Sequence, residues 1–334
     1  MFDSTPDWAT KKADFAIDLG TANTLVVQRS NGVVFEQPSV CCFDDDVDAR
    51  FELFAAGTAA KQVVGREVKR LRTVRPLRNG VLVDVRATCE LLKFAMQPIV
   101  GRRRFRRSRV VIGVPTDATQ AERRALGRAA YDAGLAEPWL MSEPVLAAIG
   151  SGFSIGEARG RMVVDCGAGT TDVIVVSLGG ICVSRSMRGG GDAVDAALIQ
   201  HLHLKRHFHI GQSSGETLKL ALSAALSTPG STCVEVKGLD TRSGLPRVIS
   251  VDIGELRPII EKYAAEVAGV VRAVFALTDP DLAMGILEDG ITLTGGAALT
   301  ALVADRIEQE TGIFVTATTE PKKAVARGLE VVLG

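Results

Sequence analysis

The pattern of apolar and polar positions predicts two similar strand–turn–strand units. Residues 15–27 read FAIDLGTANTLVV, and residues 162–176 read MVVDCGAGTTDVIVV. In each unit an apolar run ends in Asp-x-Gly, small and hydroxyl residues follow, and a second apolar run comes next. A glycine turn and a third apolar run then follow, at residues 31–35 and 179–183. The two units begin about 150 residues apart, so they predict two related domains rather than a solenoid.

Segments with helical periodicity separate and follow these units. A Thr-x-x-Glu start and a stop at Gly134 predict a helix over residues 119–133. Further helices are expected at residues 89–96, 192–204, 216–226, 254–277, 299–311 and 323–333. Strands are expected at residues 291–294 and 314–317, the first running into a Gly-Gly pair. Strands that alternate with helices, with hairpins among them, predict an α/β protein with mixed sheets.

Composition and charge narrow the function classes. A length of 334 residues with 46% hydrophobic positions favours about two domains with buried cores. Lys+Arg and Asp+Glu both number 39, and this zero net charge argues against nucleic acid as a partner and permits self-association. Six cysteines without a CxxC pair indicate buried, reduced thiols and a cytoplasmic protein. Neither a secretory signal nor a membrane-spanning run is expected.

The glycine turns carry the candidate chemistry. A strand that ends in Asp-x-Gly can point several backbone N–H groups at one spot, and such a nest binds phosphate oxygens. Asp18 and Asp165 suit Mg²⁺ that is reached through water, because Mg²⁺ keeps several waters. One such turn is commonly an ordinary tight turn, whereas two copies with a late Gly-Gly favour a clamp on a polyphosphate. Neither a P-loop nor a Rossmann fingerprint follows a strand here.

Several longer motifs point to one family. They are IDLGTANTLV at residues 17–26, a connecting segment at 64–84, VVIGVPTDATQAERRAL at 110–126, SEPVLAAIGSG at 142–152, VVDCGAGTTDV at 163–173, GGGDAVDAALI at 189–199, GETLKLALSAA at 215–225 and ITLTGGAAL at 291–299. Together they resemble the MreB/Mbl family of the actin-fold ATPases, nearly from end to end.

This resemblance implies an α/β actin-like ATPase fold. Two lobes, each built on a mixed β-sheet flanked by helices, would hold the nucleotide in the cleft between them. Lobe I would comprise residues 13–155 and 312–334, with a small subdomain at roughly 41–72. Lobe II would comprise residues 156–311, with a small subdomain at roughly 190–248, and residues 1–12 would be a tail.

The resemblance also implies a function. The chain would bind ATP and Mg²⁺, hydrolyse ATP slowly and polymerise head to tail. The filament would be cytoplasmic, lie on the inner face of the plasma membrane, and organise cell-wall synthesis and cell shape with cell-wall elongation proteins. Two alternatives stay open: a nucleotide-binding scaffold with lost or very slow hydrolysis, and a small-molecule kinase on the same fold.

The implied nucleotide-binding residues lie in the glycine turns and in two helices. They are Asp18, Gly20, Thr21, Ala22, Asn23, Asp165, Gly167, Ala168, Gly169, Thr170, Gly191, Asp192, Glu216, Thr217, Leu218, Lys219, Gly295, Gly296, Ala297, Ala298 and Leu299. For Glu216 and Lys219, which are three apart on a predicted helix, the alternative is a weak surface ion pair.

Catalysis is assigned by the same resemblance. Glu122 would position the attacking water, with Thr170, Thr171 and Asp172 orienting water or Mg²⁺ at the terminal phosphate. The alternative for Glu122 is a capping box with Thr119, and the alternative for the threonines is hydroxyls that close a turn. Because the two threonines alternate in direction, one of them is expected to face the ligand.

Three positions depart from the family pattern. Ala168 and Ala297 stand where the family usually has glycine, and Asp172 stands where it usually has glutamate. An added methyl is incompatible with such a loop only where the position has a positive φ. These changes bear on the hydrolysis rate more than on the fold.

A dense basic run suggests a contact with lipid. Arg103, Arg104, Phe105, Arg106 and Arg107 are expected in a loop that meets an anionic membrane, at roughly 1 kcal/mol per charge. The alternative is a plain solvated loop.

Overall fold

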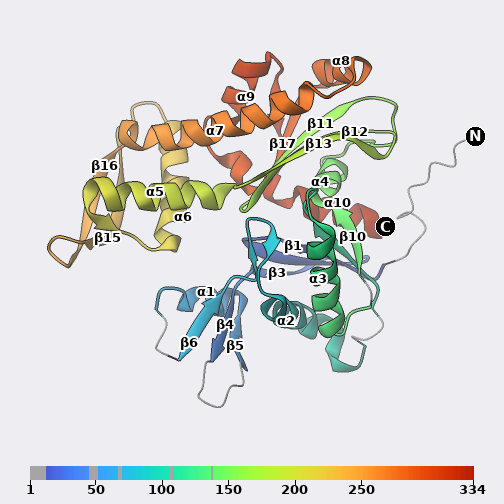
Figure 1. Cartoon of the computed structure of the whole chain (residues 1–334), viewed down its shortest axis with the longest axis horizontal. Coiled ribbons are helices and arrows are strands. Elements are labelled where there is room, and N and C mark those ends of the chain that lie inside the picture. The colour runs from blue at the N-terminus through green and yellow to red at the C-terminus, as the bar shows by residue number, and fades with distance from the viewer. Residues whose placement is uncertain (1–12, 45–51, 67–69, 105–107, 137) are drawn as a thin grey trace, which may run out of the picture.

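The computed structural model describes residues 13–44, 52–66, 70–104, 108–136 and 138–334. Figure 1 shows two lobes, one formed by the N-terminal half of the chain and the other mainly by the C-terminal half. Each lobe contains one five-stranded sheet. The expected α/β class with mixed sheets is confirmed.

The first sheet has the strand order β10-β9-β1-β2-β3. Its strands are β1 Phe15–Leu19, β2 Asn23–Gln28, β3 Gly32–Pro38, β9 Val110–Val114 and β10 Trp139–Ser142. Strand β1 runs antiparallel to β2 and parallel to β9. The first predicted unit is therefore a meander, and parallel strands added after it make the sheet mixed.

The second sheet repeats this plan, with the order β13-β12-β11-β17-β18. Its strands are β11 Arg161–Cys166, β12 Thr170–Ser177, β13 Gly180–Arg188, β17 Ile291–Thr294 and β18 Val315–Ala317. Strand β18 pairs in parallel with β17, so residues 315–317 belong to the second sheet. The expected return to lobe I at residue 312 is therefore too early, because helix α9 first brings the chain back to the edge of this sheet.

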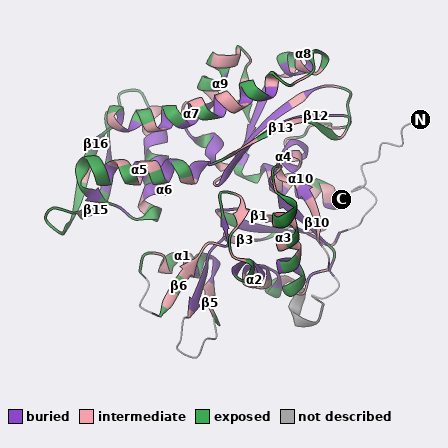
Figure 2. Ribbon diagram, in the orientation of Figure 1, coloured by how far each residue is buried: buried purple, intermediate pink, exposed green. Residues whose placement is uncertain are grey.

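Each lobe carries a smaller unit beyond its main sheet. In lobe I this unit contains β4 Cys41–Asp44, β5 Glu52–Ala56, α1 Gly57–Val63 and β6 Leu71–Val74. In lobe II it contains α5 Gly191–Arg206, β14 Phe208–His209, α6 Gln212–Leu226, β15 Cys233–Asp240 and β16 Leu245–Asp252. Figure 2 shows buried strands at the centre of both main sheets and largely exposed strands in the outer β15–β16 hairpin.

The remaining elements cover the sheets or connect them. They are β7 Leu77–Arg78, β8 Val81–Leu82, α2 Val85–Arg104, α3 Gln120–Asp132, α4 Glu143–Gly150, α7 Ile253–Phe275, α8 Pro280–Asp289, the 3₁₀ turns η3 Gly296–Leu299 and η4 Pro321–Lys323, α9 Val303–Thr311 and α10 Ala324–Leu333. Among these, α7 forms the main helical layer of lobe II and buries Leu256, Ile260, Val267 and Val271.

Helices α4 and α10 join the two lobes. Ala147 and Ala148 of α4 and Ala324 of α10 share a buried cluster with Val163 and Ile174 of the second sheet. Other residues of the same two helices pack on the first sheet. Gly150 and Gly328 allow this arrangement, because a Cβ atom on either glycine would collide with backbone of the other helix.

Two helix boundaries differ from the sequence expectation. Helix α2 begins at Val85, well before residue 89, and continues past residue 96 to Arg104. Its C-terminal turn is basic, which the helix dipole favours. The run expected as a loop thus starts inside a helix, with Arg103 and Arg104 in its last turn, whereas Phe105, Arg106 and Arg107 lie outside the described residues. The helix expected from residue 299 begins at Val303, because Leu302 takes a left-handed conformation.

The cysteine expectation is correct for four of the six residues. Cys41, Cys42, Cys89 and Cys166 are buried, whereas Cys182 and Cys233 are exposed on strands of lobe II. Across the described ranges, no helix combines the length and apolar character that a membrane span requires.

Candidate functional site

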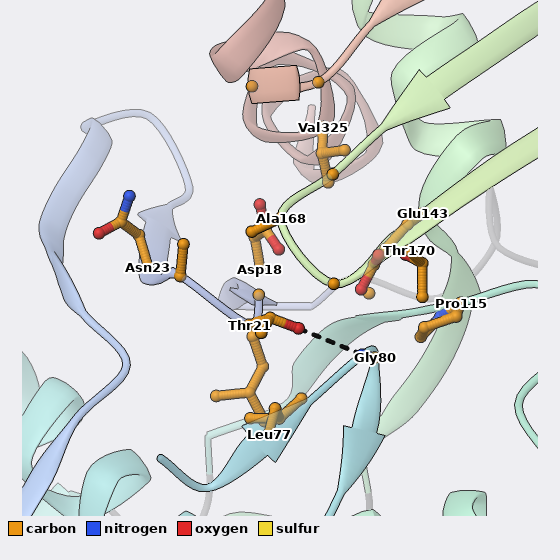
Figure 3. Close-up of a pocket in the computed structure, with 18 of the residues that line it drawn as sticks. Asp18, Thr21, Asn23, Leu77, Gly80, Pro115, Glu143, Ala168, Thr170 and Val325 are labelled. Carbon is orange, nitrogen blue, oxygen red and sulfur yellow. Dashed lines mark hydrogen bonds between the residues drawn. The ribbon is translucent and has the colours of Figure 1, made fainter. Parts of the chain in front are cut away.

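A cleft between the lobes brings most of the predicted site residues together. It is bounded by the β1–β2 turn, the β11–β12 turn, the starts of α3, α4 and α5, part of α6 and the turn after β17. Figure 3 shows part of this lining, including Asp18 and Thr21 from the first hairpin and Ala168 and Thr170 from the second. The predicted residues that line it are Asp18, Gly20, Thr21, Ala22, Asn23, Glu122, Asp165, Gly167, Ala168, Gly169, Thr170, Gly191, Asp192, Glu216, Lys219, Gly295, Gly296 and Ala297.

Six predicted residues do not line this cleft: Thr171, Asp172, Thr217, Leu218, Ala298 and Leu299. Strand alternation explains Thr171, whose hydroxyl donates to Gly189 O at 3.2 Å and lies 3.2 Å from the hydroxyl of Tyr263. Of the two threonines, Thr170 is therefore the one that faces the cleft. Leu218 is buried in the core of lobe II, and the Thr217 hydroxyl donates to Ser213 O at 2.9 Å within its own helix.

The two hairpin turns have the same internal hydrogen bond. Gly20 N donates to Asn23 O at 3.0 Å, and Gly167 N donates to Thr170 O at 2.8 Å. The turns also approach each other, because a Cβ atom on Gly169 would collide with the Thr21 hydroxyl and lie 2.8 Å from Gly80 N. Only glycine permits this approach.

Asp18 and Asp165 are each the next-to-last residue in the first strand of their hairpin, and both line the cleft. Burial, with repulsion from Asp165 and Glu36, raises the pKa of Asp18 to about 7. Burial, with repulsion from Asp172, raises the pKa of Asp165 to about 6, although the Thr294 hydroxyl donates to Asp165 Oδ1 at 2.9 Å. Two carboxylates that repel each other in this way fit a divalent cation.

The carboxylates of Asp18 and Asp165 fit Mg²⁺, which takes most of its ligands from water and phosphate, better than a metal ion that is bound by protein side chains alone. Among the described residues, no group of three or more His, Cys, Asp or Glu side chains is arranged to hold a metal ion. Mg²⁺ normally uses one or two carboxylates and takes its other ligands from water and substrate phosphates. Asp18 and Asp165 supply that many carboxylates.

Glu143 is a cleft residue that sequence reasoning missed. It is the first residue of α4 and lies on the same side of the cleft as Thr170 (Figure 3). Its side chain packs against Gly113, where a Cβ atom would lie 3.1 Å from Glu143 Cγ. Burial raises its pKa well above the usual value, with further contributions from Asp18, Asp172 and Asp165. The available signal was that Glu143 is the single acidic residue of the motif SEPVLAAIGSG at residues 142–152.

Glu122 forms the capping box that the sequence offered as its alternative role. Thr119 Oγ1 accepts from Glu122 N at 3.2 Å, and Glu122 Oε2 accepts from Thr119 N at 2.6 Å. The hydrogen bond from the Thr119 backbone is the main cause of a lowered pKa for Glu122. Its other carboxylate oxygen lies 3.4 Å from Arg188 of lobe II, which also contacts Asp117 at 3.2 Å.

Glu216 and Lys219 do not form the surface ion pair considered above. Lys219 is buried, donates to Gly191 O at 2.9 Å and pairs with Asp195 at 3.0 Å. Glu216 instead pairs with Lys61 of lobe I at 3.2 Å, which links the two lobes. Both side chains therefore border the space where the nucleoside is expected.

The backbone conformation accommodates the two alanines that replace the usual glycines of the family, Ala168 and Ala297. Among the described residues with positive φ, neither Ala168 nor Ala297 appears. An alanine methyl is therefore compatible with both loops. Asp172 is buried, and its carboxylate accepts from the Ser186 hydroxyl and from Thr116 N, the latter at 3.4 Å.

The main sheets of the two lobes have the same arrangement of strands, and their matching hairpin turns face each other across a cleft. These features define an actin-like fold with a site shaped for a nucleotide. The model of the MreB/Mbl protein family matches residues 12–334. The chain belongs to the MreB/Mbl family.

Individual relatives agree with this assignment. The cell shape-determining protein MreB of Escherichia coli (strain K12) is 38% identical over 320 residues, which cover 94% of this chain and 91% of the relative. The cell shape-determining protein Mbl of Bacillus subtilis (strain 168) is 32% identical over 320 residues, covering 96% and 95%.

Solved structures show the same fold. MreB5 of Spiroplasma citri bound to AMPPNP matches with a TM-score of 0.87 at 28% identity, over 95% of this chain and 94% of that one. A chain of the MamK double helical filament has a TM-score of 0.77 at 21% identity, over 95% of this chain and 97% of that one, which is a likeness of fold alone.

Proposed function

We propose that this chain is an ATP-dependent, filament-forming cytoskeletal protein that organises cell-wall synthesis and cell shape at the inner face of the plasma membrane. The observation that carries the proposal is the pair of facing hairpin turns, each with an aspartate beside it that lines the cleft. Membership of the MreB/Mbl family supports the cellular role, since E. coli MreB and B. subtilis Mbl are named as cell shape-determining proteins.

The ligand of the cleft is ATP with Mg²⁺. The related MreB5 of Spiroplasma citri binds AMPPNP in one structure and ADP in another. In this chain the amides of both turns bind phosphate oxygens, and Asp18 and Asp165 hold Mg²⁺ through water. When bound, Mg²⁺ neutralises charge on the phosphates. Glu216 and Lys219 border the ribose and the adenine edge.

Hydrolysis in this proposal relies on Glu143 and Thr170. Glu143 has a raised pKa, faces the cleft and lies on the same side as the Thr170 hydroxyl. These two groups orient the attacking water in line with the terminal phosphate, while the turn amides stabilise the developing charge. Glu122, the residue assigned from sequence, is held by its capping box and by Arg188, so we assign it to the contact between the lobes.

Assembly occurs head to tail between copies of the chain. Such a contact joins two different surfaces and does not close, so it generates a filament. The zero net charge leaves little long-range repulsion between subunits. The basic end of α2 is the proposed contact with anionic lipid.

The deciding experiment is electron microscopy of the purified protein with and without ATP and Mg²⁺, combined with measurement of phosphate release. Filaments that need ATP and Mg²⁺, with slow phosphate release, support the proposal. Filaments without phosphate release would identify a nucleotide-binding scaffold. Transfer of phosphate to one member of a small-molecule panel, without filaments, would identify a kinase.

A further inference from the structure

The lining of the cleft is strongly acidic for a site that binds an anionic ligand. Its carboxylates are Asp18, Glu36, Glu122, Glu143, Asp165, Asp192, Asp195 and Glu216. Its cations among the described residues are Arg123, Lys219 and Lys322. Each cation that is free to contact the ligand therefore has a large influence on its affinity.

Two of these cations are already engaged by the protein. Lys219 is paired with Asp195 and bonded to Gly191 O, as described above. Arg123 Nε donates to Ala118 O at 3.1 Å. Lys322, in contrast, makes no hydrogen bond or ion pair with any residue in the described part of the chain, and its side chain is exposed to the cleft.

The backbone of Lys322 is fixed against the glycine turn. Lys322 is the middle residue of the 3₁₀ turn η4, and Gly295 N donates to the carbonyl of its neighbour Pro321 at 3.0 Å. The Lys322 stem runs beside Gly296, since a Cβ atom on this glycine would lie 3.7 Å from Lys322 Cγ and 3.9 Å from Lys322 Cε.

The position of this turn indicates which part of the ligand Lys322 meets. On one side, a Cβ atom on Gly295 would lie 2.7 Å from Asp165 Oδ1, at the metal end of the cleft. On the other side, the turn approaches Gly191 at the nucleoside end. A Cβ atom on Gly191 would lie 3.7 Å from the Ala297 methyl and 2.8 Å from Lys219 Nζ. Lys322 thus stands between the terminal phosphates and the nucleoside.

We propose that Lys322 is a nucleotide-binding residue whose ammonium donates to an acceptor in the nucleoside monophosphate part of the ligand, either the phosphate next to the ribose or the purine ring. This inference rests on the proposed nucleotide site. An ammonium is a compact point charge with three donors, and it loses no protein partner when it turns toward the ligand.

The test compares Lys322→Gln with Lys323→Gln by equilibrium binding of ATP, ADP, AMP and adenosine. Lys323 is the matched control because it is adjacent and exposed, and its ammonium is bonded to Glu320 at 2.7 Å. For Lys322→Gln we expect Kd values for ATP, ADP and AMP that rise about three- to tenfold, as for a charged hydrogen bond that is partly open to solvent. Lys322→Arg should restore most of the affinity, and Lys323→Gln should bind as the wild type does.

The adenosine measurement assigns the acceptor. An unchanged Kd for adenosine supports the phosphate, and a raised Kd supports the purine ring. Equal binding of all four ligands by Lys322→Gln and wild type would overturn the inference, as would a loss for ATP that AMP does not share. A wild-type chain that binds none of these ligands would overturn the proposed function and this inference together.

Discussion

Two glutamates at the edge of the same cleft differ because of their immediate surroundings. Glu143 lies near three aspartates and has a raised pKa, whereas Glu122 accepts hydrogen bonds from Thr119 and has a lowered pKa. A carboxylate that already accepts the hydrogen bonds of a helix cap is poorly placed to hold a water molecule. The environment, more than the residue type, separates a candidate catalytic group from a structural one.

Replacing Glu143 or Glu122 by glutamine, one at a time, distinguishes the catalytic role from the structural role. Glu143→Gln should slow phosphate release by a factor on the order of 10²–10⁴ and leave ATP binding largely intact, because a water-positioning group contributes about that much. Glu122→Gln should leave turnover within a few-fold of wild type, since glutamine also completes a capping box. Phosphate release under single-turnover conditions measures both. The reverse pattern would return the catalytic role to Glu122.

Asp18 exerts opposite effects on binding and on stability. Asp18→Asn should abolish the Mg²⁺-dependent part of ATP affinity, measured as the difference in Kd between Mg²⁺ and EDTA. The same change should raise the melting temperature of the nucleotide-free chain, because it removes a buried charge repelled by Asp165. Unchanged Mg²⁺ dependence in both Asp18→Asn and Asp165→Asn would contradict the proposed clamp.

At the scale of elements, contacts between α3 and β13 fasten the lobes together. Arg188, the last residue of β13, pairs with Asp117 in the segment before α3 and with Glu122 in the first turn of α3. Thr116 N also donates to Asp172 of β12. These contacts link a helix start in lobe I to the strand that carries Thr170, so they are expected to favour closure of the cleft.

Removing this link should speed nucleotide release. For Arg188→Ala we expect a dissociation rate about two- to tenfold higher, given that each partly exposed ion pair contributes up to about 1 kcal/mol. Arg128→Ala is the control, because Arg128 pairs with Asp132 of its own helix at 2.8 Å. Displacement of a fluorescent nucleotide gives both rates. Identical rates for the two variants would show that the contact has no part in closure.

Element boundaries show where local patterns were sufficient. The capping box placed the start of α3 correctly, and the hairpins were recognised from their alternation and glycine turns. The pattern failed at the end of α2, because its fully buried residues end at Met96 and Ile99 is only partly buried, while the helix continues to Arg104. Helical hydrogen bonds propagate beyond the buried face, and hydrophobic periodicity does not report that extension.

At the scale of the whole molecule, polymerisation multiplies weak contacts with a membrane. Replacing Arg103, Arg104, Arg106 and Arg107 by serine should remove roughly 4 kcal/mol of attraction to anionic lipid per subunit. Avidity along a filament then makes the loss of membrane attachment steep. Cosedimentation with anionic liposomes at low and high salt is the measurement. Equal binding by the serine variant would show that this run is only solvated surface.

The sequence by itself determined the features that depend on neighbouring residues. Each Asp-x-Gly turn follows its own strand. A few neighbouring residues are therefore enough to predict that Asp18 and Asp165 lie at the turns, and that glycines there permit close approach. The repetition of this unit then predicted two related lobes and a phosphate site between them.

Only the tertiary structure decided which side chains meet. Alternation along β12 required that one of the two threonines face the cleft, and packing decided that it is Thr170, with Thr171 against Tyr263. Packing also buried Lys219 against Asp195. The packing of α4 and α10 between the sheets brought Glu143 and Lys322 to a cleft whose phosphate turns lie far away in the chain. Such contacts join residues that are distant in sequence, so no local pattern of apolar and polar positions encodes them.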